Sequence, residues 1–89
     1  MIHRIKLSYL YFNDVQNGKK NFELRKDDRN YQVGDKLLLS EVKDNVLTGR
    51  EVEVDVVYKL ADYTGLEVGY CILGIDRKRG NNNGSTRIV

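Results

Sequence analysis

Eighty-nine residues, 40% of them apolar, are enough for one domain with a single compact core. No apolar stretch approaches the roughly 18 residues that span a membrane, and residues 1–6 lack the apolar segment of a signal peptide, so we expect a cytoplasmic protein. The net charge of +2 divides between a tail, residues 77–89, with four basic residues and no acid, and a body, residues 1–76, with 11 basic and 13 acidic residues. The body is therefore not a generic polyanion binder, and any nucleic-acid site on it must be a local patch.

The chain opens with a predicted strand and a predicted helix. Residues 2–7 mix apolar and polar side chains, which indicates a strand with an irregular start. Ser8 is a plausible N-cap, because Tyr11, Phe12 and Val15 follow at helical spacing. The pair Asn17-Gly18 then ends the helix, which we predict to be about ten residues long.

Strands dominate after this helix. Residues 21–26 alternate, with Phe22 and Leu24 on one face and Glu23 and Arg25 on the other, as in a half-buried strand. Residues 27–30 form a polar loop, and residues 33–35 a tight turn before a buried strand at 36–42.

The second half of the chain predicts two more strands. Residues 43–49 are typical of a hairpin loop. The strand after it, which runs toward Leu60, turns its valines inward and its acidic residues outward; the valines are Val52, Val54 and Val56, and the acids are Glu51, Glu53 and Asp55. A loop at 61–69 and a last strand at 70–75 complete the domain, and the tail is predicted to be disordered. The order β-α-β-β-β-β defines an α+β chain and favours a small closed or partly closed barrel.

One motif carries a family resemblance. The stretch GKKNFELR, residues 18–25, fits the pattern G-x-K-x-x-E-x-R, with Gly18, Lys20, Glu23 and Arg25 in the four fixed places. Together with the VGD turn, the later TGREVEVDV and the closing GYCILGI, it resembles the ASCH domain superfamily, and within it a branch of small bacterial and phage-associated proteins. The resemblance covers residues 2–75. It implies a PUA-like, mostly antiparallel β-barrel with the motif lining a cleft, RNA binding, and, in some relatives, deacylation of acetylated cytidine.

The motif residues have physical readings of their own. Gly18 suits a left-handed turn that ends the helix. Lys20 can contact a phosphate or serve in acid–base chemistry. Glu23 and Arg25 either form a surface ion pair or bind a base, a sugar hydroxyl or a phosphate, and the pairing can also orient the arginine. Four further residues extend the predicted nucleic-acid site, namely Lys19, Lys26, Arg29 and Tyr31. Tyr31 either stacks on a base or packs on the barrel mouth.

The sequence gives little support for a reactive thiol or for a metal site. Cys71, the only cysteine, lies in an apolar run and is expected to be a buried core residue. The acidic stripe Glu51, Glu53 and Asp55 is read as a solvated strand face, because a flat face does not wrap its carboxylates around one ion. We therefore predict no metal and no cofactor.

Three functions remain open. The leading hypothesis is a monomeric module that binds single-stranded RNA or a nucleotide-like ligand. The alternative is an amidohydrolase acting on a modified nucleoside, with Lys20 and Glu23 in proton transfer. The enzyme relatives carry a threonine where this chain has Glu23, and their catalytic glutamate has no assigned counterpart here, although Glu67 lies in the right half. The third is a phage or mobile-element accessory protein that binds a host protein.

Overall fold

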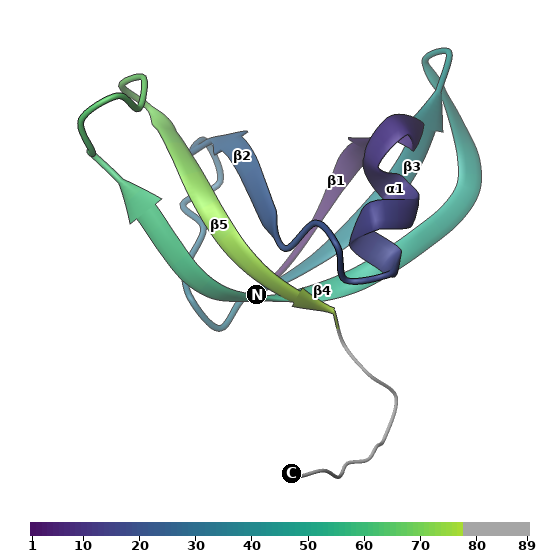
Figure 1. Ribbon diagram of the computed structural model, residues 1–89, viewed down its shortest axis with the longest axis horizontal. Coiled ribbons are helices and arrows are strands. Elements are labelled where there is room, and N and C mark those ends of the chain that lie inside the picture. Colours follow the sequence, from purple (N-terminus) through teal and green to yellow (C-terminus); the bar gives the residue numbers. More distant parts are fainter. Residues whose placement is uncertain (78–89) are drawn as a thin grey trace, which may run out of the picture.

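One curled sheet of five strands holds more than half of residues 1–77 (Figure 1). The computed structural model describes residues 1–77. In chain order the elements are β1 (Ile2–Ser8), α1 (Tyr9–Gln16), β2 (Phe22–Lys26), β3 (Lys36–Lys43), β4 (Val46–Ala61) and β5 (Tyr70–Arg77). This confirms the predicted order β-α-β-β-β-β. Arg77 closes β5 and was wrongly assigned to the tail; the rest of that prediction, residues 78–89, lies outside the described residues.

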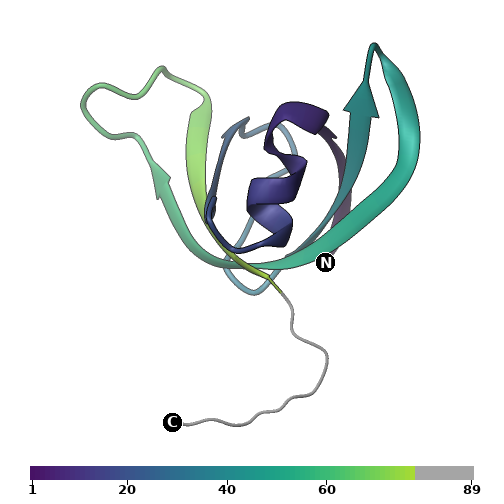
Figure 2. The ribbon, with the colours of Figure 1, turned by 45° about the vertical axis from the view of Figure 1, so that its right-hand side comes forward.

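The sheet curls because the long strand β4 pairs with both β3 and β5. Its 16 residues pair first with β3 and then with β5, with a shift of register between Val56 and Tyr58. The strand order is β1-β3-β4-β5-β2, in which only β1 and β3 run parallel. The result is an open half-barrel, with α1 inside the curve of the sheet (Figures 1 and 2). The α+β class and the mostly antiparallel sheet are confirmed, and the barrel is partly closed, with β1 and β2 as its two edges.

The core lies on the concave side of the sheet. Val52, Val54 and Val56 point inward as predicted, and Cys71 is fully buried among them. Phe12 and Val15 anchor α1 to this core. Outside, the acidic stripe is ion-paired: Glu51 with Arg4, and Glu53 and Asp55 with Lys36. The inward and outward assignment of this strand was therefore correct.

The hairpin between β3 and β4 is tighter than predicted. Asp44 and Asn45 both have positive φ, 52° and 64°, as the two-residue turns that match strand twist require. β4 accordingly begins at Val46, so the predicted loop at 43–49 was too long. The Asp-Asn pair, which tolerates left-handed backbone, forms the whole turn, and Gly49, which suggested a longer loop, lies within β4.

The face of β2 is the opposite of what its pattern indicates. Phe22 and Leu24 are 49% and 57% exposed, whereas Glu23 is 3% exposed. A half-buried strand normally turns its apolar residues to the core. Here the inner face of this edge strand meets the barrel mouth, where two cations satisfy the buried carboxylate. Because of this reversal, Glu23 and its two cation partners, Lys20 and Arg25, lie at the barrel mouth.

No helix within residues 1–77 is both long and apolar enough to cross a membrane.

Candidate functional site

The turn after α1 positions the motif residues at the start of β2. Ser8 caps the start of the helix, as predicted, by accepting a hydrogen bond from Leu10 N. Gly18 follows the helix with φ of +79°, the left-handed conformation predicted for it. Asp14 O then accepts from both Lys19 N and Lys20 N, at 2.8 and 2.9 Å. This closed turn starts β2 beside the barrel mouth and fixes where Lys20 begins.

Glu23 is clamped between two cations. Lys20 Nζ donates to Glu23 Oε1 at 2.5 Å, and Arg25 Nε and Nη2 donate to Oε2 at 3.2 and 3.1 Å. Both carboxylate oxygens are thus engaged. The geometry gives Glu23 a positioning role: its charge stays buried only because the two cations neutralise it.

Lys20 and Arg25 each have N–H groups that donate to no residue within 1–77. An ammonium has three N–H groups, and Lys20 uses one on Glu23 and one on Phe22 O at 2.7 Å. Arg25 uses Nε and Nη2, which leaves Nη1 without a protein partner among residues 1–77. Lys20 Nζ also lies 4.8 Å from the Phe22 ring centroid and 5.7 Å from that of Tyr11. Two oriented cations next to two aromatic rings can receive a phosphate and a flat ring.

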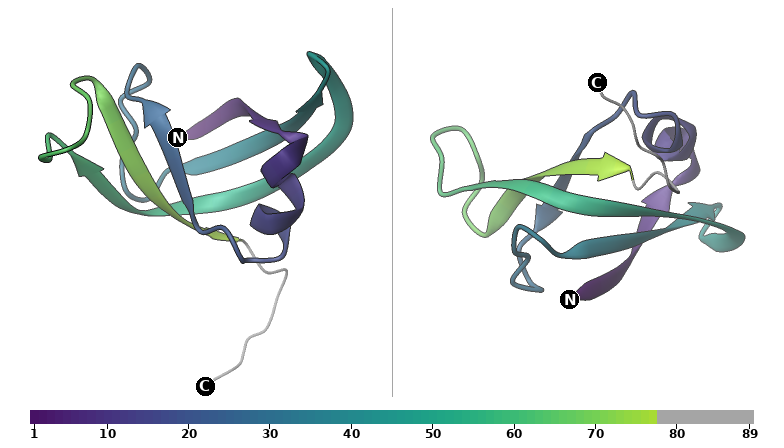
Figure 3. Two further views of the ribbon diagram at one scale, coloured as in Figure 1. Left: turned by 45° about the horizontal axis from the view of Figure 1, so that its top comes forward. Right: turned by 90° about the horizontal axis from the view of Figure 1, so that it is seen from below.

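Arg25 also bridges the seam between the two edge strands. Its Nη2 donates to Lys6 O of β1 at 2.5 Å. Figure 3 shows, from two further sides, the curled sheet whose edges are β1 and β2. A pocket lies on each side of this bridge. One, here called the motif pocket, is lined by Lys6, Leu7, Ser8, Tyr11, Lys20, Phe22, Glu23, Leu24 and Arg25. The other, here called the basic pocket, is lined by Arg4, Ile5, Lys6, Arg25, Lys26, Asp28, Arg29 and Tyr31.

The basic pocket is the more positively charged of these two pockets. Five of its lining residues are basic and one is acidic. Arg4 is paired with Glu51, and Arg25 with Glu23. The ammonium and guanidinium groups of Lys6, Lys26 and Arg29 make no ion pair with any residue that the structure describes. The local patch predicted from the sequence is therefore present, and β1 contributes to it.

Tyr31 is buried, which corrects its predicted use as a stacking platform. Its side chain is 2% exposed, and its ring meets the His3 ring edge-on at 4.8 Å between centroids. Lys59 Nζ holds the loop by donating to Tyr31 O at 2.7 Å and pairing with Asp27 at 2.8 Å. Packing on the barrel mouth, the other reading of Tyr31, is confirmed, and burial raises the pKa of its phenol. The lysine lowers the pKa of the Asp27 carboxyl.

The remaining predicted residues divide between the two pockets, with one exception. Lys20, Glu23 and Arg25 meet at the motif pocket, and Lys26 and Arg29 at the basic pocket. Lys19 is exposed and lines neither. Among the basic and aromatic lining residues, sequence reasoning missed four that pattern alone did not mark, namely Arg4, Lys6, Tyr11 and Phe22.

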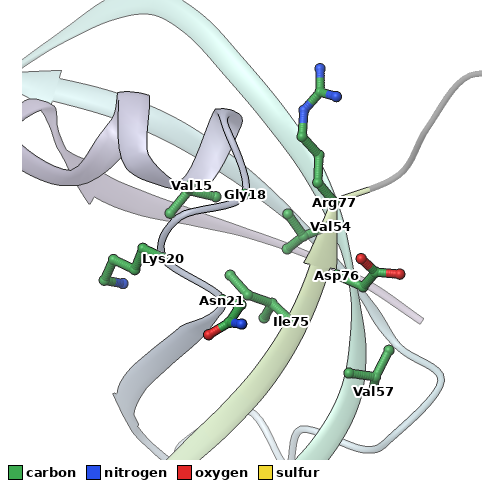
Figure 4. Close-up of a pocket in the computed structure, with 9 residues that line it drawn as sticks. All are labelled: Val15, Gly18, Lys20, Asn21, Val54, Val57, Ile75, Asp76 and Arg77. Carbon is green, nitrogen blue, oxygen red and sulfur yellow. The ribbon is translucent and has the colours of Figure 1, made fainter.

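A third pocket lies behind Lys20, at the end of the helix (Figure 4). Its floor is apolar, formed by Val15, Val54 and Ile75. In Figure 4 the charged ends of Lys20 and Arg77 extend away from these side chains. Lys20, Asp76 and Arg77 also line this helix-end pocket, so its lining carries a net formal charge of +1 (two basic residues and one acid), compared with +4 in the basic pocket (five basic residues and one acid).

Metal and thiol chemistry have no assembled site here. Within residues 1–77 no three His, Cys, Asp or Glu side chains are grouped to hold an ion. Burial raises the pKa of the Cys71 thiol, so this cysteine is held in its protonated, unreactive form.

The fold and the site define a small α+β protein, a half-barrel whose mouth carries a buried glutamate, oriented cations and a basic groove. The chain belongs to the family described as "Domain of unknown function (DUF3850)", which matches residues 2–75. It is also similar to the "Uncharacterized 12.9 kDa protein in GpA 3'region" of Escherichia phage P2, with 48% identity over 65 residues. This match covers 73% of the present chain and 56% of the phage protein, so it spans about half of the relative's length.

Proposed function

We propose that this protein binds single-stranded RNA or a nucleotide-like ligand in the groove formed by the motif pocket and the basic pocket. The observation that carries the proposal is the clamp on Glu23. It fixes Lys20 and Arg25 in the groove while leaving each of them at least one N–H for a ligand. Fixed donors of this kind bind a phosphate well, because little side-chain entropy is lost on binding.

The rest of the groove suits the same ligand. Lys6, which forms no ion pair within residues 1–77, adds a positive charge beside the clamp. The rings of Tyr11 and Phe22 supply stacking surface at the rim. The resemblance of GKKNFELR to the ASCH motif supports the same class of ligand. The acidic body disfavours long duplexes, which need broad positive surfaces.

Hydrolysis of a modified nucleoside is the lesser candidate. It is kept because Lys20 and Glu23 are in direct contact at the motif pocket. However, both oxygens of Glu23 already accept hydrogen bonds and Glu67 lines none of the three pockets. A proton acceptor for water is therefore not offered by this arrangement. Incubation with acetylated cytidine, followed by chromatography, tests it: accumulating cytidine would make the protein an enzyme.

Binding is tested by fluorescence anisotropy with a labelled, six-nucleotide oligouridylate at low and at moderate salt. We expect saturable, salt-dependent binding that weakens about tenfold in Lys20→Ala or Arg25→Ala, because each removes a charged hydrogen-bond donor. Lys19→Ala is the matched control, since it removes the same charge from outside the pockets. Absence of saturable binding, or an equal loss in Lys19→Ala, would contradict the proposal.

A further inference from the structure

The basic pocket extends the groove beyond the motif. It shares Lys6 and Arg25 with the motif pocket, so the two adjoin across the bridge from Arg25 Nη2 to Lys6 O. Along β1 the motif pocket takes residues 6–8 and the basic pocket residues 4–6. Five strand residues span about 13 Å, so the groove continues well past the reach of one phosphate.

Each pocket is of a size to take one small group. Their volumes are about 370 and 320 Å³, at the lower end of the roughly 300–1,000 Å³ of ligand pockets. Their linings differ in kind. The motif pocket combines the Glu23 clamp with aromatic rings. The basic pocket has no exposed aromatic ring in its lining, and three of its cations have no counterion among the described residues 1–77. The first suits a base with its phosphate, and the second suits an anionic group.

The phenol of Tyr31 is an independent sign of a ligand. Buried tyrosine hydroxyls usually find a hydrogen-bond partner. The Tyr31 side chain lines the basic pocket and is 2% exposed, yet its hydroxyl has no hydrogen-bond partner within residues 1–77. Arg25 and Arg29 lie close enough to oppose the rise in its pKa. A phosphate oxygen in this pocket could satisfy the hydroxyl and both guanidinium groups together.

From these observations we infer that the basic pocket is a second subsite that takes a phosphodiester. The ligand is then an oligonucleotide of at least two linked nucleotides, in place of a free nucleoside or mononucleotide. This inference rests on the proposed function and adds the length of the ligand and the place of its second phosphate. A mononucleotide fills one pocket only, because its single phosphate is joined through one ribose to the base that occupies the motif pocket.

Ligand length therefore tests the inference. Competition against the labelled oligouridylate would give dissociation constants for uridine monophosphate, its 5′-phosphorylated dinucleotide and the trinucleotide. For the wild type we expect the trinucleotide to bind at least about tenfold more tightly than the mononucleotide, the gain expected from one additional charged contact. The salt dependence is expected to steepen by about 0.7 in logarithmic slope for each added phosphate contact.

Two variants separate the subsites. Lys26→Ala/Arg29→Ala is expected to reduce the gain from length to within about threefold, because it removes two cations from the basic pocket and none from the motif pocket. Lys19→Ala/Lys43→Ala is the matched control, with the same charge change at exposed positions outside both pockets. Tyr31→Phe removes only the hydroxyl, which has no partner to lose among the described residues, and is expected to weaken the trinucleotide alone.

The outcomes distinguish this inference from the function on which it rests. A mononucleotide that binds as tightly as the trinucleotide would overturn the second subsite and leave the proposed function standing. The second subsite would also be overturned if Lys26→Ala/Arg29→Ala and Tyr31→Phe both bound the trinucleotide as tightly as the wild type does. Failure of every ligand, the trinucleotide included, would overturn the proposed function itself.

Discussion

Two buried glutamates, Glu41 and Glu23, use similar chemistry in different places. Glu41 is 5% exposed and accepts from Arg50 Nε and Nη2, at 3.0 and 2.7 Å, and from Thr48 Oγ1. Arg50 in turn reaches Asn13 Oδ1 at 3.1 Å and lies 4.5 Å from the Phe12 ring centroid. This cluster ties the β3–β4 hairpin to α1, and it lines none of the three pockets.

The Glu23 clamp differs in where its cations lie. Lys20 and Arg25 line the groove between the sheet edges, and each keeps N–H groups that no described residue uses. A buried ionised carboxylate is thus no mark of function by itself, because satisfied pairs also hold elements together. What marks a site is a cation that is held in place and still has donors directed to open space.

The largest effect on folding is expected at the structural cluster. Arg50→Ala leaves Glu41 buried with only Thr48 as a partner and uncovers the Phe12 ring, so the melting temperature should fall by roughly 5–10 °C. Oligonucleotide affinity of the folded protein should not change. Differential scanning fluorimetry and anisotropy on the same sample measure both, with Lys43→Ala as the exposed control. A loss of affinity with unchanged melting temperature would mean that the Glu41 cluster takes part in binding and does not stabilise the fold.

The next largest effect is expected at the groove, where a substitution should change oligonucleotide affinity more than melting temperature. Arg25→Lys keeps the charge but loses the planar fork that spans Glu23 and Lys6 O. Affinity for the oligouridylate should fall about tenfold, whereas the melting temperature should fall less than in Arg50→Ala. Retained affinity would show that a point charge is enough at this position and would weaken the case for an oriented donor.

Acid should expose the contribution of Glu41. Arg50 holds the pKa of Glu41 at about 2, below its usual 4.5, and His3 holds that of Asp35 at about 2, below 3.8. A carboxyl with a lowered folded-state pKa stabilises the fold above its unfolded pKa, and this stabilisation is lost as pH falls toward the folded value. Stability should therefore decline between about pH 5 and pH 2.

Glu41→Gln separates the two carboxyls. The variant is expected to be less stable at pH 7 and to lose less on acidification than the wild type, since Asp35 and Asp27 then respond without Glu41. Urea unfolding at pH 7 and pH 3 gives the comparison. An unchanged acid dependence in this variant would mean that Glu41 does not titrate as described.

The smallest effect is expected for Thr48→Val. This change keeps the β-branched shape and removes the hydroxyl that donates to Glu41 Oε1. Arg50 still satisfies the carboxylate, so the melting temperature should drop by only a few degrees and affinity should be unchanged. A fall as large as that of Arg50→Ala would show that the hydroxyl, more than the guanidinium, keeps Glu41 buried.

Local periodicity predicted the features that depend on near neighbours. The element order, the Ser8 cap, the turn at Gly18 and the inward valines of β4 are all confirmed. Each follows from spacing within about ten residues, where the chain's own geometry decides.

Apart from the length of the β3–β4 hairpin loop, the errors arose where distant strands decide. The exposed faces of β2 follow from its place at the sheet edge, and Tyr31 is buried because Lys59 and His3 hold its loop. Lys6 joined the site because β1 pairs with β3 in parallel and becomes the opposite edge. No local pattern in residues 2–8 encodes that pairing, so half of the groove was out of reach of sequence reasoning.

The most direct test is a titration of isotope-labelled protein with the uridine trinucleotide, followed by amide chemical shifts. Shifts concentrated on β1 and β2, at Lys6, Lys20, Phe22 and Arg25, with Thr48 and Arg50 unmoved, are the expected result. Shifts centred on the hairpin, confined to residues after Arg77, or absent at millimolar ligand would contradict nucleic-acid binding in this groove.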